Sequence, residues 1–304
     1  MKIIITGATS FIGVHVIKEC IIKDYEVYAV IRPNSVNLSR LPKSDKIHVV
    51  ELEMGDYDRL VKCIGSADAF VHLAWDGARV PHRDNAEMQL KNYECAIEAM
   101  NVAIKLGCQV FLGSGSQAEY GKMDGPVDES YPCNPITEYG KAKLKTCCVL
   151  SNLAEENNMR FIWTRIFSIY GRYDYKGTLV MSCIDKMRRN ETMQMTACTQ
   201  LWDYMYVSDV ARALVGLVHN KKINGIYNIA SGNIRPLKYF VEEIKSILGS
   251  KSVVDYGAIP YGIAGPVNLQ PDVRKIQKEL GYSPKYEFRE GICEMLKMYC
   301  GGGR

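Results

Sequence analysis

The first thirteen residues, MKIIITGATSFIG, lead an apolar strand directly into a glycine turn. Residues 3–5 are isoleucines, a β-branched run that is too short for a helix and typical of a buried parallel strand. Gly7 and Gly13 bracket the turn, and residues 14–23 carry apolar side chains at helical spacing. A helix N-terminus reached through such a turn is suited to hold a pyrophosphate. We expect Gly7 to permit the tight turn and Gly13 to let the helix pack closely on the strand; the alternative is a strand–helix corner that binds nothing.

The composition is that of an ordinary globular protein. The 304 residues are 47% hydrophobic and 24% charged, which is enough to bury a large core. The net charge of +4 comes without a polybasic run, which argues against nucleic-acid binding, and no apolar stretch is long enough to span a membrane. The first strand leaves no room for a signal peptide. Eleven cysteines without a CxxC pair indicate a reducing, cytoplasmic environment, and residues 301–304 (GGGR) are expected to form a flexible end.

Strands and helices alternate through the first half of the chain. The expected strands are residues 3–5, 26–31, 47–52, 69–74, 110–112 and 161–166, and the expected long helices are residues 14–23, 87–106 and 139–157. This alternation predicts an α/β fold with a Rossmann-type, doubly wound parallel sheet.

Beyond residue 167 the elements become short, although residues 204–210 and 226–229 still look like sheet or core. We therefore expect a dinucleotide-binding domain over residues 1–167, to which residues 203–230 return. The remaining residues, 168–202 and 231–304, are expected to form a smaller, discontinuous substrate-binding lobe over the carboxyl edge of the sheet, where the ligands of such sheets bind.

Tyr139 and Lys143 lie four residues apart near the start of an expected helix, so their side chains share one face. Thr137 is a suitable cap for that helix. A lysine ammonium beside a phenol lowers the pKa of the phenol, and such a tyrosine can exchange a proton with a carbonyl near neutral pH. Ser114 and Ser116 follow strand 110–112, where a hydroxyl can hold a substrate oxygen. The alternative is that these serines only satisfy backbone groups of a glycine-rich loop.

The chain resembles the extended short-chain dehydrogenase/reductase family, of the nucleotide-sugar epimerase, dehydratase and reductase type. The matching motifs, in order along almost the whole chain, are TGATSFIG at 6–13, GSQAEYG at 115–121, TEYGKAK at 137–143, RIFSIYG at 165–171, WDYMYVSDVARA at 202–213 and LGYSPKYEFREGI at 280–292. The resemblance implies that Ser116, rather than Ser114, forms a catalytic triad with Tyr139 and Lys143. Tyr139 would be the acid/base, and Lys143 would also hold the nicotinamide ribose.

One departure from the family pattern narrows the reaction. In the family's 4,6-dehydratases an Asp–Glu pair follows the catalytic hydroxyl residue and eliminates water, whereas this chain has Gln117 and Ala118 there. Neither side chain can carry a proton through an elimination, and Glu119 comes one position too late. What remains is hydride and proton transfer at a single carbon, either as a reduction or as an epimerisation in which the sugar is oxidised and then reduced on its opposite face.

The end of the second strand bears on the cofactor. Members that prefer NAD place an acid there to bond the ribose 2′-hydroxyl, but this chain has Ile31 followed by Arg32. A guanidinium suits a 2′-phosphate and favours NADP over NAD; the alternative is that Arg32 is a solvated loop residue. The resemblance also implies that Asp56 lies near the adenine and that Asn92 matches a helix asparagine of the family. The residues expected to bind the cofactor are Gly7, Ser10, Phe11, Ile12, Gly13, Arg32, Asp56, Leu73, Ala74, Asn92, Ser114, Tyr139 and Lys143.

A nucleotide-diphosphate sugar needs an arginine in the smaller lobe to meet its diphosphate. Arg172, Arg235 and Arg274 are the candidates, and Ser168 occupies a position where many family members have an asparagine. Asp203 and Asp209 are expected to have structural roles. The histidines show no ligand spacing, so no metal site is expected.

These residues predict an NADP-dependent 4-ketoreductase that acts on a nucleotide-activated deoxysugar. The resemblance further implies a homodimer formed through helices 87–106 and 139–157. A first alternative is a nucleotide-sugar 4-epimerase with tightly bound NAD. A second, non-enzymatic alternative is an NADP-binding sensor or scaffold; such a protein is expected to lack one of the three active side chains, and all three are present.

Overall fold

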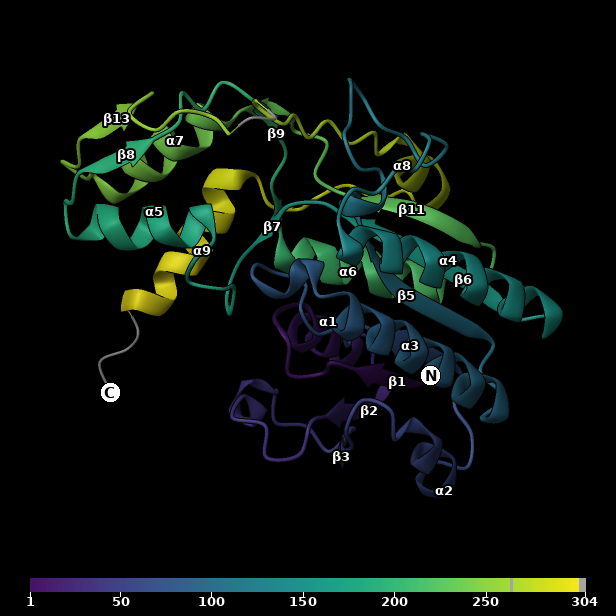
Figure 1. The fold of residues 1–304 in the computed structure, drawn as a ribbon. Coiled ribbons are helices and arrows are strands. Elements are labelled where there is room, and N and C mark those ends of the chain that lie inside the picture. Colours follow the sequence, from purple (N-terminus) through teal and green to yellow (C-terminus); the bar gives the residue numbers. More distant parts are fainter. Residues whose placement is uncertain (263–264, 301–304) are drawn as a thin grey trace.

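A seven-stranded parallel sheet forms the centre of the molecule, which we describe from a computed structural model over residues 1–262 and 265–300 (Figure 1). The expected flexible end, residues 301–304, lies outside the described residues. The strands, in their order across the sheet, are β11 (Gly225–Ile229), β6 (Arg160–Ile166), β5 (Val110–Ser116), β4 (Ala69–His72), β1 (Lys2–Thr6), β2 (Glu26–Ile31) and β3 (Ile47–Glu51). The predicted doubly wound parallel sheet is confirmed.

The inner strand β1 shows why this sequence has three isoleucines at residues 3–5. Ile3, Ile4 and Ile5 are fully buried, because β1 pairs with β2 on one side and with β4 on the other and both of its faces are covered. The order of the strands reverses between β1 and β4. In open sheets of this kind, ligands bind outside the carboxyl ends of the strands at such a reversal.

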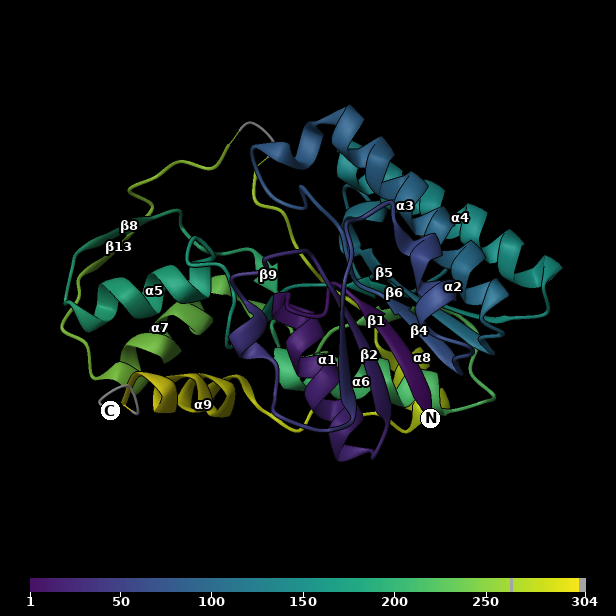
Figure 2. The same cartoon turned by 90° about the horizontal axis from the view of Figure 1, so that it is seen from below.

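Helices cover both faces of the sheet (Figure 2). The helices α1 (Phe11–Ile22) and α6 (Val207–His219) pack against each other on one face, and α3 (Ala86–Lys105), α4 (Glu138–Glu156) and the short α2 (Leu60–Cys63) lie on the other. Each long helix on the second face begins at a side-chain cap. The Asn85 Oδ1 accepts the Met88 N–H at 3.0 Å, and the predicted cap Thr137 accepts the Gly140 N–H at 3.1 Å.

The strand β5 is longer than the sequence indicates, because it continues from residue 112 to Ser116. Gly113 and Gly115 are weak strand formers, and they are present because Trp163 on the neighbouring β6 fills the space beside them. A Cβ at Gly113 would lie 2.4 Å from the Trp163 ring, and one at Gly115 would lie 2.3 Å from its Nε1. Ser114 and Ser116 are therefore on the strand itself and not in a loop.

A second group of elements lies beyond the carboxyl edge of the sheet, at the left of Figure 1. The helices are α5 (Leu179–Arg188), α7 (Leu237–Leu248) and α9 (Phe288–Cys300), and two strands, β8 (Met193–Met195) and β13 (Val254–Tyr256), pair with each other. These elements share a separate apolar core that includes Ile184, Phe240 and Phe288. Two further pairs join the layers, β7 (Ile169–Tyr170) with β10 (Met205–Tyr206) and β9 (Leu201–Trp202) with β12 (Arg235–Pro236).

The boundaries of the two parts differ in detail from the expected ones. Of residues 204–210, only Met205 and Tyr206 form a strand, and Val207 already begins α6. The helix α8 (Arg274–Leu280) packs against β11, so this part of the expected range 231–304 lies with the main sheet. The expected division into domains otherwise stays a prediction.

Two buried aspartates hold these returning segments in place. The Asp203 carboxylate accepts the Ser231 N–H at 2.9 Å, and Asp209 accepts the backbone N–H groups of Lys285 and Tyr286 at 2.9 Å each. Both therefore have the structural role expected of them. Within the described residues, no helix combines the length and the apolar character needed to cross a membrane.

Candidate active site

The glycine turn after β1 requires both of its glycines. Gly7 has a φ of +67°, and a Cβ there would lie 2.8 Å from the amide nitrogen of Ala74. A Cβ at Gly13 would lie 2.2 Å from the carbonyl oxygen of Gly7. Gly13 therefore lets the helix approach the turn, whereas we expected it to let the helix approach the strand. Ser10 caps α1, because its Oγ accepts the Gly13 N–H at 3.1 Å.

Two cavities meet at this turn. The first, of ≈ 130 Å³, lies between the turn and the ends of β2 and β4. The second, of ≈ 740 Å³, extends from the turn over the ends of β5 and β6. Ser10, Leu73 and Trp75 line both cavities, which therefore adjoin along the carboxyl edge of the sheet. Of the residues predicted to bind cofactor or substrate, the first cavity brings together Gly7, Ser10, Arg32, Leu73 and Ala74, and the second Ser10, Phe11, Ile12, Leu73, Ser114, Ser116, Tyr139 and Lys143.

Local packing places Tyr139 beside Ser116. Gly140 allows the first turn of α4 to approach the segment after β5, since a Cβ there would lie 2.5 Å from the carbonyl oxygen of Ala118. The Ser116 Oγ accepts the Ala118 N–H at 3.2 Å and also hydrogen-bonds the Tyr139 hydroxyl. While it accepts the bond from Ala118, the Ser116 hydroxyl can donate its own proton to the oxygen of Tyr139.

Burial sets the ionisation of Tyr139. It raises the pKa of the phenol, while the hydrogen bond from Ser116 and the positive charge of Arg83 lower it and the charge of Glu119 raises it further. The Arg83 guanidinium carbon lies 5.1 Å from the centre of the Tyr139 ring, and the Lys143 Nζ lies 5.8 Å from it. Arg83 is therefore a second cation beside the phenol, in addition to the lysine that the spacing of residues 139 and 143 suggests.

Lys143 is enclosed by the sheet and by Trp75. Its side chain is buried, and its Nζ donates to the carbonyl oxygen of Ser114 at 2.6 Å. The same nitrogen lies 3.5 Å from the centre of the Trp75 ring, a close cation–π contact. Burial lowers the pKa of Lys143 to about 7, although the charge of Glu119 acts in the opposite direction.

The model of the NAD-dependent epimerase/dehydratase family matches residues 3–230 of this chain. The chain belongs to this family. It is thus an NAD(P)-dependent enzyme of the extended short-chain dehydrogenase/reductase type, as the sequence motifs indicated.

Individual members of the family are similar over most of their length. The dTDP-6-deoxy-L-talose 4-dehydrogenase (NAD(+)) of Aggregatibacter actinomycetemcomitans is 27% identical over 273 residues, which are 86% of this chain and 95% of that protein. The CDP-abequose synthase of Salmonella muenchen is 25% identical over 310 residues, 98% of this chain and 97% of the relative. Among solved structures, a UDP-glucuronic acid 4-epimerase from Bacillus cereus, in complex with UDP-glucuronic acid and NAD, shares the fold with a TM-score of 0.85 and 21% identity, over 98% of each chain.

The cofactor residues predicted around the first cavity have three different surroundings. Arg32 lines this cavity with a side chain that is 66% exposed, and its guanidinium lies 3.5 Å from the Asp76 carboxylate. Asp56 is not among the lining residues, although its neighbours Met54 and Tyr57 are. Asn92 is buried and does not line this cavity; it accepts the Asp76 N–H at 2.9 Å and donates to the Asp76 carbonyl at 2.8 Å. Asn92 therefore holds the segment after β4 and does not face the cavity.

None of the four residues predicted to bind substrate lines either cavity. Arg235 pairs with Glu243 at 3.2 Å, and Arg274 forms a surface pair with Asp272, so both guanidiniums are already engaged. Arg172 stacks over Tyr173, at 4.7 Å from its ring centre. The Ser168 carbonyl accepts the Met205 N–H between β7 and β10. A substrate-binding role for these four residues stays a prediction without a supporting contact.

The arginine that does line the second cavity is Arg79, which the sequence analysis did not single out. It comes from the segment after β4, lies 3.3 Å from the Asp174 carboxylate and stacks over Tyr175 at 4.8 Å. Arg83 follows in the same segment, held by the bond from the Glu138 N–H to Asp84 at 3.1 Å. The sequence feature that could have indicated Arg79 is the presence of two arginines in one short segment after β4, a strand that ends at the carboxyl edge of the sheet where ligands bind.

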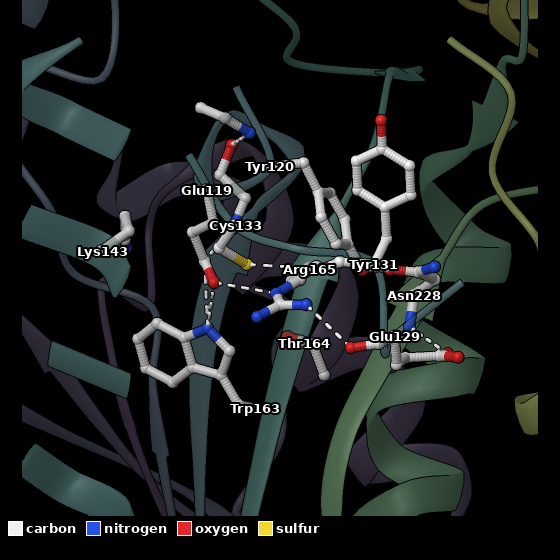
Figure 3. A network of polar contacts seen from close by, with 12 residues as sticks. Glu119, Tyr120, Glu129, Tyr131, Cys133, Lys143, Trp163, Thr164, Arg165 and Asn228 are labelled. Atoms are coloured by element: carbon white, nitrogen blue, oxygen red, sulfur yellow. Dashed lines mark hydrogen bonds and ion pairs between the residues drawn. The ribbon is translucent and has the colours of Figure 1, made fainter. Parts of the chain in front are cut away.

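A network of buried polar groups supports β5 from behind (Figure 3). The Glu119 carboxylate lies at its centre and accepts bonds from Ser116 N–H at 2.8 Å and from Arg165 Nε at 2.9 Å. Trp163 Nε1 donates to the same carboxylate at 3.0 Å. Glu119 comes one position after the acid of the dehydratases, and it lines neither cavity.

Proposed function

We propose that this protein is a 4-ketoreductase that reduces a nucleotide-activated deoxysugar with NADPH. The observation that carries the proposal is the meeting of Ser116, Tyr139 and Lys143 in the second cavity, with Gln117 and Ala118 in place of a proton-transferring pair. Such a site can deliver one proton to the oxygen of a carbonyl group, and positions 117 and 118 offer no acid for the elimination of water.

The residues present fit a dinucleotide. The positive φ of Gly7, the close approach at Gly13 and the N-terminus of α1 form a cradle that a side chain would fill, and the adjoining cavities lead from Arg32 to Lys143. Gly7, Ser10 and Gly13 would hold the pyrophosphate, and Lys143 the nicotinamide ribose. When bound, the nicotinamide supplies the hydride to the carbonyl carbon.

Proton transfer then falls to Tyr139. Its hydroxyl gives a proton to the carbonyl oxygen as that oxygen becomes the new hydroxyl of the sugar. The Ser116 hydroxyl accepts the Ala118 N–H and donates its own proton in a hydrogen bond to the reacting oxygen. Protonated Lys143 and Arg83 place positive charge beside the phenolate that Tyr139 becomes, which lowers the cost of losing its proton.

The choice of NADP rests on the first cavity. Arg32 reaches this cavity, and the strand that precedes it ends in Ile31 and not in an acid. The guanidinium would pair with a 2′-phosphate. The relatives named above include an NAD(+) enzyme and an NAD complex, which support NAD as the alternative. Dissociation constants for NADPH and NADH decide between the two: Arg32→Ala is expected to weaken NADPH by about tenfold and to leave NADH unchanged.

The substrate class is supported by two relatives whose names refer to nucleotide-linked sugars, one of them a 6-deoxy sugar. In the second cavity Arg79 is the cation suited to an anionic group of such a substrate, and Asp174 and Tyr175 hold it across the opening. Assays with a panel of 4-keto dTDP-, CDP- and UDP-sugars would identify the nucleotide base and the sugar.

A 4-epimerase is the second candidate, because the solved relative described above carries that name and holds NAD. The same three side chains would then remove a proton in the first half of the cycle and return it in the second. An epimerase keeps its cofactor through purification and turns over without added NADPH, whereas a reductase consumes NADPH in a one-to-one ratio with product. Cofactor content and stoichiometry therefore distinguish the two candidates.

The central test is Tyr139→Phe, assayed by NADPH oxidation at 340 nm with a panel of 4-keto dTDP-, CDP- and UDP-sugars. Loss of the general acid is expected to lower kcat by about a hundredfold or more. Tyr239→Phe makes the same change on the exposed face of α7 and is expected to leave kcat unchanged. Undiminished turnover by the Tyr139 variant would refute the role of this residue. A wild-type protein that binds NADPH but oxidises it with no member of the panel would favour a sensor over an enzyme.

A homodimer through α3 and α4 is proposed as well. The two helices pack side by side, and Leu90 on α3 is 49% exposed next to a shallow hollow formed with Tyr93 and Lys145. An exposed leucine at this place is suited to an apolar helix–helix interface. Light scattering is expected to give twice the chain mass, and Leu90→Lys is expected to shift the protein to the monomer.

A further inference from the structure

The Glu119 carboxylate lies directly behind the active-site serine. It belongs to the single turn η4 (Gln117–Glu119) that follows β5, and it is completely buried. Its Oε1 accepts the Ser116 N–H at 2.8 Å, while the Ser116 Oγ accepts the Ala118 N–H, so the two side chains form a reciprocal capping box. This box fixes the backbone of Ser116 at the point where its hydroxyl meets Tyr139.

The carboxylate cannot itself exchange a proton with a ligand. It lines neither cavity, and its oxygens accept bonds from Ser116, Trp163 and Arg165. Gly115 shows how close it lies to the strand, because a Cβ there would be 2.5 Å from the Glu119 Oε1. Glu119 must therefore act through other residues, and Figure 3 shows the Lys143 side chain on the opposite side of this carboxylate from Arg165.

Lys143 meets few charged groups. Its own helix brings Tyr139, which is neutral because burial raises the pKa of its phenol. The strand β4 brings His72, which is also neutral because burial lowers its pKa to about 3. The neighbouring Trp75 and Trp163 are uncharged rings, at 3.5 and 6.0 Å from the Nζ. In the described part of the chain, Glu119 is the negative charge that opposes the loss of the proton from Lys143.

We propose that Glu119 is a positioning residue of the active site, which fixes the Ser116 turn and places a negative charge behind Lys143. This inference rests on the proposed roles of Ser116 and Lys143 in reduction. Arg165 and Trp163 hold the Glu119 carboxylate in place through their hydrogen bonds to it. Substitution of Glu119 is therefore expected to affect the chemistry of the site without removing any group that touches a ligand.

Two variants and one control test the proposal in the full-length protein. Glu119→Gln removes the charge and keeps the shape, but it leaves Arg165 buried without its ionic partner, which can prevent folding. Glu119→Gln combined with Arg165→Gln removes both charges and avoids that problem. Glu129→Gln is the matched control, since Glu129 accepts the Asn228 N–H at 2.8 Å at the far side of the same network and contacts neither Ser116 nor Lys143.

The first readout needs no substrate. Competitive labelling with acetic anhydride from pH 5 to pH 10, read by peptide mass spectrometry, gives the midpoint at which Lys143 loses its proton. Wild type and the control are expected to titrate near pH 7, and the Glu119 variants about one unit lower. The second readout is kcat for NADPH oxidation with a 4-keto nucleotide sugar, which is expected to fall about tenfold or more in the Glu119 variants because Ser116 loses its support.

Folded Glu119 variants with a wild-type Lys143 midpoint and a wild-type kcat would overturn the proposal and leave Glu119 a purely structural residue. A shifted midpoint with a lowered kcat supports it. Should wild type oxidise NADPH with none of the sugars, the proposed function fails, whereas the labelling result still decides whether the charge of Glu119 acts on Lys143. The two failures are thus distinguishable.

Discussion

A single lysine carries much of the pH dependence expected of this enzyme. The folded state holds Lys143 with a pKa of about 7, whereas the group titrates near 10.5 in the unfolded chain. If protonated Lys143 is needed for reduction, kcat/KM is expected to fall as the pH rises through about 7. A pH profile of kcat/KM, which reports the free enzyme, checks this directly.

The same lysine predicts the opposite trend for stability. Between pH 7 and 10.5 the unfolded chain binds one proton more than the folded protein at this position. The free energy of unfolding is therefore expected to rise with pH over this window. Lys143→Met should remove this rise, as measured by urea unfolding at pH 7 and pH 9, and an unchanged slope in the variant would assign the trend to other groups.

At the scale of elements, the turn between β1 and α1 tolerates no added atom. Gly13→Ala would place a methyl 2.2 Å from the Gly7 carbonyl, so the turn or the helix must shift. We expect a loss of about 1–3 kcal/mol in unfolding free energy, and a weaker affinity for NADPH that calorimetry would measure. Gly65→Ala is the control, because nothing lies within 4 Å of a Cβ there, and it should change neither quantity appreciably.

Elements were predictable where local pattern and tertiary packing agree. The strand β2 occupies the predicted residues 26–31, since its apolar residues are those that the sheet buries. The strand β5 was predicted too short, because Gly113 and Gly115 argue locally against a strand and only the ring of Trp163, fifty residues away, explains them. Residues 204–210 were predicted as sheet or core and contain both: Met205 and Tyr206 form a strand, and the apolar side chains that follow belong to the buried face of α6.

At the scale of the whole molecule, one ion pair connects the two sides of the second cavity. Arg79 follows β4, and Asp174 follows β7 at the start of the outer group of elements. Arg79→Gln would remove a charged hydrogen-bond donor, and we expect KM for the nucleotide sugar to rise about tenfold while the dissociation constant of NADPH is unchanged. An equal loss for both ligands would indicate a general change of the fold instead.

Such long-range pairs mark the limit of what the sequence predicts about the site. Ser116, Tyr139 and Lys143 were predicted because each lies within a recognisable motif, and all three line one cavity. Arg79 and Asp174 are 95 residues apart and carry no motif, so only the folded chain brings them together. Arg235 and Arg274 were chosen by charge alone, and acidic neighbours engage both of them outside the two cavities.

The glycines of β5 limit how this enzyme can be redesigned. Gly113 and Gly115 are filled from behind by Trp163, so the rear wall of the pocket offers neither spare volume nor a position that accepts a larger residue. Variants with larger residues at Gly113 or Gly115 are therefore not expected to yield enzymes that accept new sugars. Arg79 lies at the rim of the pocket with a side chain that is 52% exposed, so substrate scope is expected to evolve at this rim while the strand beneath stays unchanged.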